Sequence, residues 1–195
     1  MNAAQPRFLV MAGPNGVGKP TCAARFLPTA VPSINADDIA KTLTSEPTHE
    51  TEIQAARIAL GLKDEAESRR ETFATEATLA SRTLASRAIR LQAAGYQFRL
   101  FNIWTTDPDF SISRVARRVR LGGHDIPEAT IRRRWLGGLG NFFSLYQPIA
   151  DQWQVIDNAT SSEPQIVASG PRANTDTIHD RVLWDEIKRR AEDAT

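Results

Sequence analysis

The sequence has little that would tie it to an oxidising compartment or to a membrane. Its single cysteine, Cys22, has no second thiol in the chain with which to form a disulfide, which suits a reducing compartment. The longest stretch without a charged residue, 135–150, is interrupted by Gly, Asn, Ser, Gln and Pro and is shorter than the about 20 apolar residues of a membrane-spanning helix. The first apolar run leads into a glycine-rich loop rather than into a cleavage site. We therefore expect a cytoplasmic protein that does not bind membranes.

An excess of charge of one sign is also missing. The chain has 24 lysines and arginines against 23 aspartates and glutamates, so its formal net charge is +1. A charge so close to zero gives no global attraction to nucleic acid or to a membrane surface. Of the basic residues 20 are arginine, and Lys19 is one of only four lysines. The partners of the protein must therefore be inferred from local motifs.

Length and patterning predict an α/β fold. The 195 residues suffice for a single domain that buries about 70% of the surface of its unfolded chain. Short apolar runs alternate with longer amphipathic stretches, which is typical of a mostly parallel sheet with helices on both faces. We expect a three-layer sandwich with five or six strands, an arginine-rich, lid-like segment at about 109–138 and a C-terminal helix at about 175–192.

The boundaries of these elements follow from apolar runs and from capping residues. Gly95 is expected to end a helix, and Asp107 with Pro108 is expected to start one. The predicted strands are 7–12, 33–36, 72–77, 98–104 and 153–158, with a sixth at 164–169. The predicted helices are 19–27, 50–70, 79–94, 109–121, 127–138 and 175–192.

Residues 13–21, GPNGVGKPT, come close to the phosphate-binding pattern G-x-x-x-x-G-K-[ST]. In such a loop the glycines let backbone N–H groups turn toward the phosphates, the following helix points its positive end at them, and the lysine reaches the outer phosphates. An apolar strand before the loop and a helix after it supply the required context, whereas a plain glycine-rich turn is the alternative. The predicted nucleotide-binding residues of this segment are Gly13, Asn15, Gly16, Val17, Gly18, Lys19 and Thr21, and Lys19 is also predicted to be catalytic.

Pro20 stands where the pattern requires Ser or Thr. Proline has no hydroxyl for Mg²⁺ and no N–H for a phosphate, and the loss of a hydrogen bond to a charged group lowers affinity roughly 10- to 150-fold. Proline is well tolerated in the first turn of a helix, so the fold should persist better than the chemistry. Thr21 offers a hydroxyl one residue later, rotated about 100° around the helix, which makes it a weak candidate metal ligand.

With these residues in view, the chain resembles the zeta-toxin family of P-loop kinases, in its short single-domain branch. The resemblance spans about residues 7–158 and rests on the order and spacing of several motifs. These are MAGPNGVGKPT, INADDIA, TEATLASR, AGYQFRL, RVARRVRLGGHDIP, IRRRW and DNAT.

The resemblance implies a P-loop kinase-like fold and an activity. Members of the family use ATP and Mg²⁺ to phosphorylate a sugar hydroxyl of UDP-N-acetylglucosamine, which starves cell-wall synthesis. The preference for ATP over GTP is likewise taken from the family. Family members are often held inactive by a small antitoxin that blocks the nucleotide pocket, so an antitoxin is a possible partner.

Carboxylates are predicted at two places on the acceptor side. The resemblance assigns Asp37 as the catalytic base that takes the proton of the acceptor hydroxyl, with Asp38 as the neighbouring candidate and Asn35 as a substrate-binding residue. The alternative for Asp37 is a helix N-cap. Glu76 and Thr78 match acceptor- or metal-contacting positions at the carboxyl edge of the sheet, where ligands collect. The alternative for Glu76 is a cap on the following helix.

Residues 114–134 carry an excess of positive charge. Seven arginines, Arg114, Arg117, Arg118, Arg120, Arg132, Arg133 and Arg134, face only Asp125 and Glu128, which leaves a local charge of +5. Such cations suit the charge-spread transition state of phosphoryl transfer. Arg118, as a catalytic residue, and Arg133 or Arg134, as nucleotide-binding residues, match the family best. The others are expected at the surface or in packing.

The remaining predictions concern two loops. Gly122 and Gly123 would let the arginine-rich segment move, and His124 is expected to shape that loop. Asn158, in DNAT, matches a family position near the nucleotide, although an Asn turn explains it equally well.

Two other classes of function compete with a kinase. Because of Pro20, the chain could be a degenerate nucleotide-binding protein without turnover. Nucleic-acid binding through the arginine-rich segment is disfavoured, because that segment lacks interleaved aromatic residues.

Overall fold

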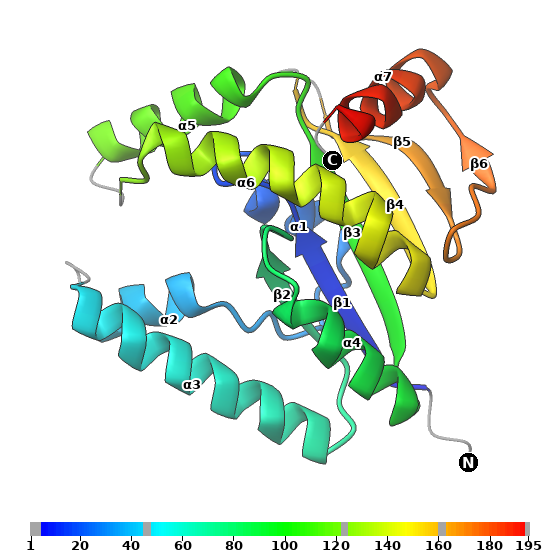
Figure 1. Ribbon diagram of the computed structural model, residues 1–195. Coiled ribbons are helices and arrows are strands. Elements are labelled where there is room, and N and C mark those ends of the chain that lie inside the picture. The colour runs from blue at the N-terminus through cyan, green and yellow to red at the C-terminus, as the bar shows by residue number, and fades with distance from the viewer. Residues whose placement is uncertain (1–4, 45–47, 122–124, 160–162, 194–195) are drawn as a thin grey trace.

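The computed structural model describes residues 5–44, 48–121, 125–159 and 163–193 (Figure 1). At its centre is a six-stranded sheet in which four strands are parallel and the last two are antiparallel. In spatial order the strands are β2 (Phe73–Ala77), β1 (Arg7–Ala12), β3 (Gln97–Trp104), β4 (Gln152–Asp157), β5 (Gln165–Gly170) and β6 (Thr177–Ile178). This is the α/β sheet that the sequence predicts.

Helices connect the strands and pack on both faces of the sheet. They are α1 (Lys19–Phe26), α2 (Ala36–Leu43), α3 (His49–Ser68), α4 (Thr83–Ala93), α5 (Pro108–Arg120), α6 (Glu128–Asn141) and α7 (Arg181–Glu192). A π-helical turn, Phe142–Tyr146, and a 3-10 turn, Gln147–Ile149, extend α6 toward β4.

The two faces of the sheet are covered unequally. On one face, α4, α6 and α7 bury a large core that includes Phe8, Phe98 and Trp153, and the aromatic rings of Trp153 and Trp184 stack with centroids 5.6 Å apart. On the other face, α1 buries a smaller cluster that includes Met11 and Cys22. Figure 1 shows α1 behind the sheet and α4 and α6 in front of it.

The chain order places the loop after β1 at a reversal of the strand order. β1 lies between β2 and β3, so the connections leaving β1 and β2 lead to opposite sides of it. The carboxyl ends of parallel strands at such a reversal form the usual ligand-binding edge of an open α/β sheet. The glycine-rich loop therefore stands where a ligand is expected.

The predicted strand 33–36 is wrong. Ser33 makes only an isolated bridge to Ala74, and the chain then enters α2, a helix that was considered only in the alternative in which Asp37 is an N-cap. The side chain of Asn35 caps this helix by accepting a hydrogen bond from the N–H of Asp37. Asp37 and Asp38 in the first turn stabilise the positive N-terminal end of the helix. Together with the Asn35 cap, they outweigh the preference of the short apolar run for a strand.

Two helix starts also differ from the predictions. The C-terminal helix begins at Arg181 rather than near residue 175, because Thr177–Ile178 pairs with β5 as β6 and the Asp180 side chain accepts from the N–H of Leu183 at 2.9 Å. The helix predicted from residue 79 begins at Thr83.

Other boundary signals are confirmed. Asp107 accepts a hydrogen bond from the N–H of Asp109 at 2.8 Å, and Pro108 is the first residue of α5. Gly95 follows α4 with φ +87°, as expected for a glycine that ends a helix. In the described parts of the chain, each helix is too short or too polar to cross a membrane.

Candidate functional site

The loop between β1 and α1 adopts a backbone that requires glycine. Gly16 and Gly18 have φ angles of +82° and +92°. A Cβ atom on Gly16 would lie 2.3 Å from the carbonyl oxygen of Ser111, and one on Gly18 would lie 2.3 Å from Nδ2 of Asn158. Both positions are therefore closed to other residues by conformation and by space.

The carbonyl oxygen of Val17 is held from outside the loop by two side chains. Asn158 donates from Nδ2 at 2.7 Å and Arg114 donates from a terminal nitrogen at 3.2 Å. The Arg114 guanidinium also lies 4.2 Å above the ring of Phe110. In a trans peptide the C=O and the next N–H point in opposite directions, so the N–H of Gly18 points away from these two donors.

Lys19 begins α1 and bends back over the loop. Its Nζ donates to the carbonyl oxygens of Gly13 at 3.1 Å and Pro14 at 3.2 Å. Burial lowers the pKa of Lys19, and the carboxylates of Glu76 and Asp37 act in the opposite direction. The ammonium group is therefore poised over the loop and within the field of two acids.

Pro20 is the second residue of α1 and is exposed. The N–H groups of the first helical turn have no intrahelical partner, so proline leaves the helix intact there. Thr21 follows in the same turn, also exposed. Pro20 thus removes a hydroxyl and a donor from the loop without disrupting the fold.

Glu76 is placed beside the loop by the sheet. It pairs with Met11 near the end of β2 and is half-buried. Burial raises the pKa of Glu76, Lys19 lowers it, and Asp38 and Asp37 raise it further. Since α4 starts only at Thr83, the alternative that Glu76 caps the following helix is wrong.

Asp37 and Asp38 lie in the exposed first turn of α2. Asn35 is the cap, so the alternative that Asp37 caps this helix is wrong. Both carboxylate oxygens of Asp38 accept hydrogen bonds, Oδ2 from Nδ2 of Asn35 at 3.3 Å and Oδ1 from Nζ of Lys41 at 2.8 Å. The carboxylate of Asp37 makes no hydrogen bond or ion pair with the described residues, so it remains available to a ligand.

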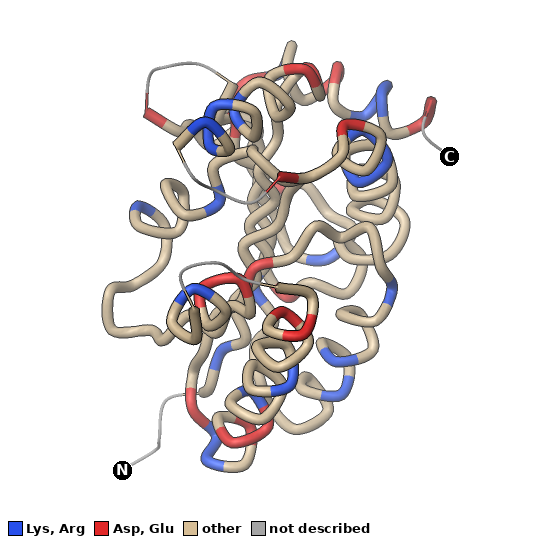
Figure 2. The backbone as a smooth tube through the Cα atoms, turned by 90° about the vertical axis from the view of Figure 1, so that its left-hand side faces the viewer, with Lys and Arg blue, Asp and Glu red and all other residues tan. Residues whose placement is uncertain are grey.

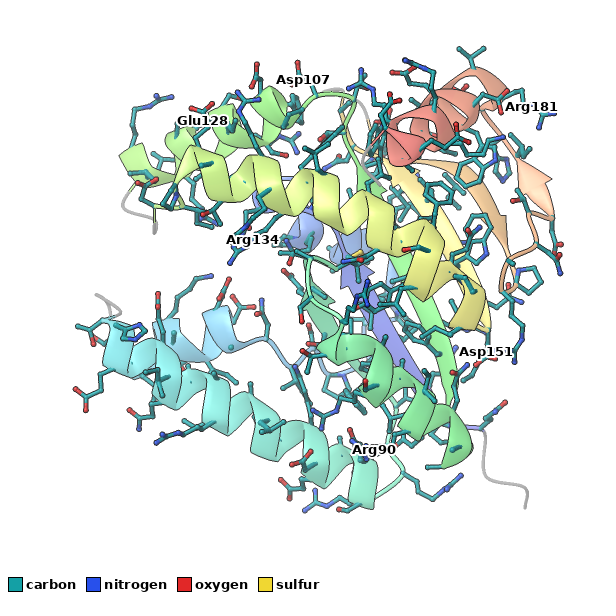
Figure 3. All side chains as sticks on the ribbon, in the orientation of Figure 1. Arg90, Asp107, Glu128, Arg134, Asp151 and Arg181 are labelled. Carbon is teal, nitrogen blue, oxygen red and sulfur yellow. The ribbon has the colours of Figure 1, made fainter. Side chains whose placement is uncertain are left out.

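The arginine-rich helices contribute unequally. Arg134 projects from α6 (Figure 3), and a terminal nitrogen donates to Oδ1 of Asn15 in the loop at 2.7 Å. Arg118 and Arg134 both lower the pKa of Lys19, which places their charges near it. Arg133, one residue before Arg134, is exposed. Arg132 forms ion pairs with Glu128 and Asp109. Of the two predicted alternatives, Arg134 is the one that contacts the loop.

Thr78 reaches the same edge from the end of β2. It lines a small cavity together with Gly13, Pro14 and Trp135. A Cβ atom on Gly138 would lie 2.5 Å from the carbonyl oxygen of Thr78, so glycine in α6 permits the close approach of helix and strand. The predicted residues from β1, β2, α2, α6 and the end of β4 thus converge on one edge.

Sequence analysis did not single out Arg114 among the seven arginines. It lies four residues before Arg118 on α5, so both face the same side of the helix, and that spacing was the available signal. Gly122, Gly123 and His124 lie outside the described residues. Within the described residues no cluster of three or more His, Cys, Asp or Glu is arranged to hold a metal ion.

The charges are divided between two groups of helices. The upper half of Figure 2 holds the arginine-rich helices α5 and α6, which also carry Asp109 and Glu128, and the lower half holds α2 with its two aspartates and Lys41. Such a division places cations against one part of a ligand and carboxylates against another.

Comparison with known proteins agrees with this fold. A protein of Haemophilus influenzae, described as uncharacterized, is 27% identical over 131 residues, which cover 67% of this chain and 94% of that protein. A chain of the AvrRxo1-ORF1:AvrRxo1-ORF2 complex with sulphate ions superposes with a TM-score of 0.74 at 15% identity over 95% of this chain. This chain spans 64% of the length of that protein.

A second solved structure extends the comparison. A chain of the PezAT chromosomal toxin–antitoxin system of Streptococcus pneumoniae matches with a TM-score of 0.68 at 18% identity, over 100% of this chain and 87% of that chain. The fold implied by the zeta-toxin resemblance is thereby confirmed. A family model described as AAA domain matches residues 8–134, which is more than half of the sequence, and the chain belongs to this AAA domain family.

Proposed function

We propose that the protein is an ATP-dependent small-molecule kinase. It transfers the γ-phosphoryl group to a sugar hydroxyl of a UDP-activated amino sugar such as UDP-N-acetylglucosamine. The observation that carries the proposal is the convergence of a phosphate-type loop with Lys19, Glu76 and Asp37 at the carboxyl edge of the sheet. The sugar acceptor is taken from the resemblance to zeta toxins.

The loop binds the phosphates in this proposal. The N–H of Gly18 points away from Asn158 and Arg114 and is free to meet a phosphate oxygen. Lys19 leaves the carbonyl oxygens of Gly13 and Pro14 and donates to the outer phosphates. ATP as the nucleotide is supported by a solved structure of the AvrRxo1-ORF1:-ORF2 complex with ATP, which shares the fold.

Asp37 is the base that takes the proton from the acceptor hydroxyl. Its carboxylate is exposed and uncommitted among the described residues, whereas Asp38 is held by Asn35 and Lys41. A base must lie within hydrogen-bond reach of the proton that it removes. Glu76, Asn35 and Thr78, on the same side, orient the acceptor.

The cations stabilise the charge of the transferred group. Arg118 and Arg134 lie close enough to Lys19 to affect its pKa, and Arg134 already contacts the loop through Asn15. Arg114 positions the loop through the carbonyl oxygen of Val17. Preorganised donors of this kind lower the barrier because they need no rearrangement as negative charge develops.

Mg²⁺ is expected to accompany ATP. Bound at the phosphates, it would neutralise their charge and align the γ-phosphoryl group. The usual hydroxyl ligand is missing because of Pro20, so Thr21 and the carboxylates of Glu76 and Asp37 are the candidate oxygen donors to Mg²⁺. Weak binding of Mg²⁺ is therefore part of the proposal.

Pro20 favours a second candidate function. With neither a hydroxyl nor an N–H at this position, the protein could hold a nucleotide without turning it over. In either case we propose an antitoxin-like partner. This is supported by the two solved structures of similar fold, which come from the AvrRxo1-ORF1:AvrRxo1-ORF2 complex and from a toxin–antitoxin system.

One assay separates the candidates. The wild-type protein, Pro20→Ser and Pro20→Ser/Lys19→Met are incubated with ATP, Mg²⁺ and a panel of UDP-sugars, and phosphorylated products are detected by mass spectrometry. Transfer by Pro20→Ser but not by the double variant supports the kinase. Binding of ATP without transfer by either the wild-type protein or Pro20→Ser supports the second candidate, and failure of all variants to bind ATP contradicts both.

A further inference from the structure

The open part of the sheet face behind α1 forms a second cavity, remote from the glycine-rich loop. Its volume is about 480 Å³, within the range of about 300–1,000 Å³ that is typical of small-molecule sites. The floor is formed by side chains of β3, β4 and β5, and Arg25 and Phe26 of α1 form one wall. This cavity is named the α1-side groove.

The floor of the α1-side groove is polar where a covered sheet face would be apolar. The alternation of the strands places Gln97 and Arg99 of β3 on this face together with Gln152 and Gln154 of β4. Ser169 of β5 pairs with Gln154. These side chains supply amide, guanidinium and hydroxyl groups to whatever occupies the groove.

Arg99 in the floor of the groove and Arg7 beside the groove lie near each other without a neutralising carboxylate among the described residues. Arg99 and Arg7 are diagonal neighbours on β3 and β1, since Arg7 pairs with Gln97 and Leu9 with Arg99. Neither side chain forms an ion pair with a described carboxylate, whereas Arg25 is paired with Glu163 at 2.6 Å. Burial and the charge of Arg7 lower the pKa of Arg99. Two like charges on neighbouring strands repel each other, and an anion bound between them would relieve this repulsion.

The hydrogen bonding of Arg99 leaves its outer edge free. Nε donates to Oε1 of Gln97 at 3.0 Å, and this contact orients the guanidinium plane. The two terminal nitrogens make no hydrogen bond with the described residues. A pair of parallel N–H groups matches the two oxygens of a carboxylate or a phosphate.

We propose that the α1-side groove is a binding site for a small organic anion that carries a phosphate or carboxylate group. The guanidinium of Arg99 binds the charged group, Arg7 adds a second positive charge, and the glutamines of β3 and β4 bind the polar remainder. The site is separate from the proposed active site, because Arg7 starts β1 and the loop follows its end, about 17 Å away for a six-residue strand.

The test uses the full chain carrying Lys19→Met, so that phosphate binding at the loop is weakened. Inorganic phosphate, citrate and the uncharged sugar N-acetylglucosamine are titrated while the side-chain NH signals of Arg99, Gln97 and Gln154 are followed by NMR. The proposal predicts saturable shifts with phosphate or citrate and none with the sugar. The anion that binds more tightly identifies the phosphate or the carboxylate as the preferred group.

Two variants provide the decisive comparison. Arg99→Gln should weaken anion binding by about tenfold or more, because it removes the charge and the paired donors. Arg57→Gln, which removes an exposed charge on α3, should leave the affinity unchanged. Thermal unfolding with and without the anion checks folding, because binding raises the Tm of the Lys19→Met protein with or without Arg57→Gln, but not when Arg99→Gln is added. Linear, unsaturable shifts, or equal affinities for the two variants, would show an adventitious ion only and overturn the proposal.

Discussion

The phosphate side and the acid side of the proposed site are built differently. On the phosphate side, the loop is fixed by contacts from three distant parts of the chain, through Asn158, Arg114 and Arg134. On the acid side, Asp37 stands in the exposed first turn of an eight-residue helix whose cap is Asn35. If the proposed function is right, nucleotide binding depends on tertiary contacts to the loop, whereas proton transfer depends on the start of one helix that the local sequence determines.

Removal of the base should have the largest effect. In a Pro20→Ser background, Asp37→Asn is expected to lower kcat by about 10²- to 10⁴-fold, because general base catalysis contributes about that much. Nucleotide affinity should not change, since the phosphate side is intact. Asp38→Asn is the matched control, and an equal loss of kcat for both variants would contradict the assignment of Asp37.

Removal of Lys19 tests the phosphate side. In the same background, Lys19→Met should lower kcat/KM by about 10²- to 10³-fold, the usual cost of losing a preorganised donor to developing charge. The ammonium group of Lys19 is half-buried and forms no ion pair with a described carboxylate, so its removal should not lower thermal stability. Lys41→Met, on the surface of α2, serves as the control. Full activity of Lys19→Met would show that the loop does not hold the phosphates.

Two asparagines allow the sides to be compared directly. Asn158→Ala removes a hydrogen bond worth about 0.5–1.5 kcal/mol, so nucleotide affinity should fall roughly 2- to 13-fold. Asn35→Ala removes a helix cap worth about 1 kcal/mol, so kcat should fall while nucleotide affinity persists. Calorimetric titration measures the nucleotide affinity of each variant, and steady-state kinetics measures its kcat. If both variants changed the same parameter, the proposed division of labour would be wrong.

The smallest effect concerns pH. The pKa of Glu76 is raised by burial above its ordinary value of 4.5, so folding favours the protonated carboxyl. Its stabilising contribution is complete below about pH 4.5 and is lost as the pH rises through the raised pKa. The free energy of unfolding of Glu76→Gln should therefore increase relative to that of the wild-type protein as the pH rises above about 4.5. Urea unfolding at a series of pH values measures this difference, and a difference independent of pH would contradict the burial of the charge.

Local sequence signals predicted most of the fold. The apolar runs at 7–12 and 98–104 became β1 and β3, and Asp107 with Pro108 began α5 as expected. The run at 33–36 failed because a capping asparagine followed by two aspartates begins a helix, and this signal was missed in favour of a short apolar pattern.

The site was predictable only in part. The glycines and Lys19 follow from a pattern of adjacent residues, so the loop could be placed from sequence. The choice between Arg133 and Arg134, and the contact of Arg114 with Val17, depend on how α5 and α6 are oriented over the loop. That orientation is set by packing between elements that lie about 100 residues apart in the chain. The spacing of residues within one helix does not specify such packing.

The central claim is that the backbone of residues 13–19 binds a nucleotide phosphate. It is tested most directly by ¹⁵N–¹H NMR of the Pro20→Ser protein during titration with a non-hydrolysable ATP analogue. We expect saturable shifts of the amide signals of Gly16, Gly18 and Lys19, and we expect Lys19→Met to weaken the binding that these shifts report. Amide signals in the loop that stay unchanged at every concentration of the analogue would contradict it.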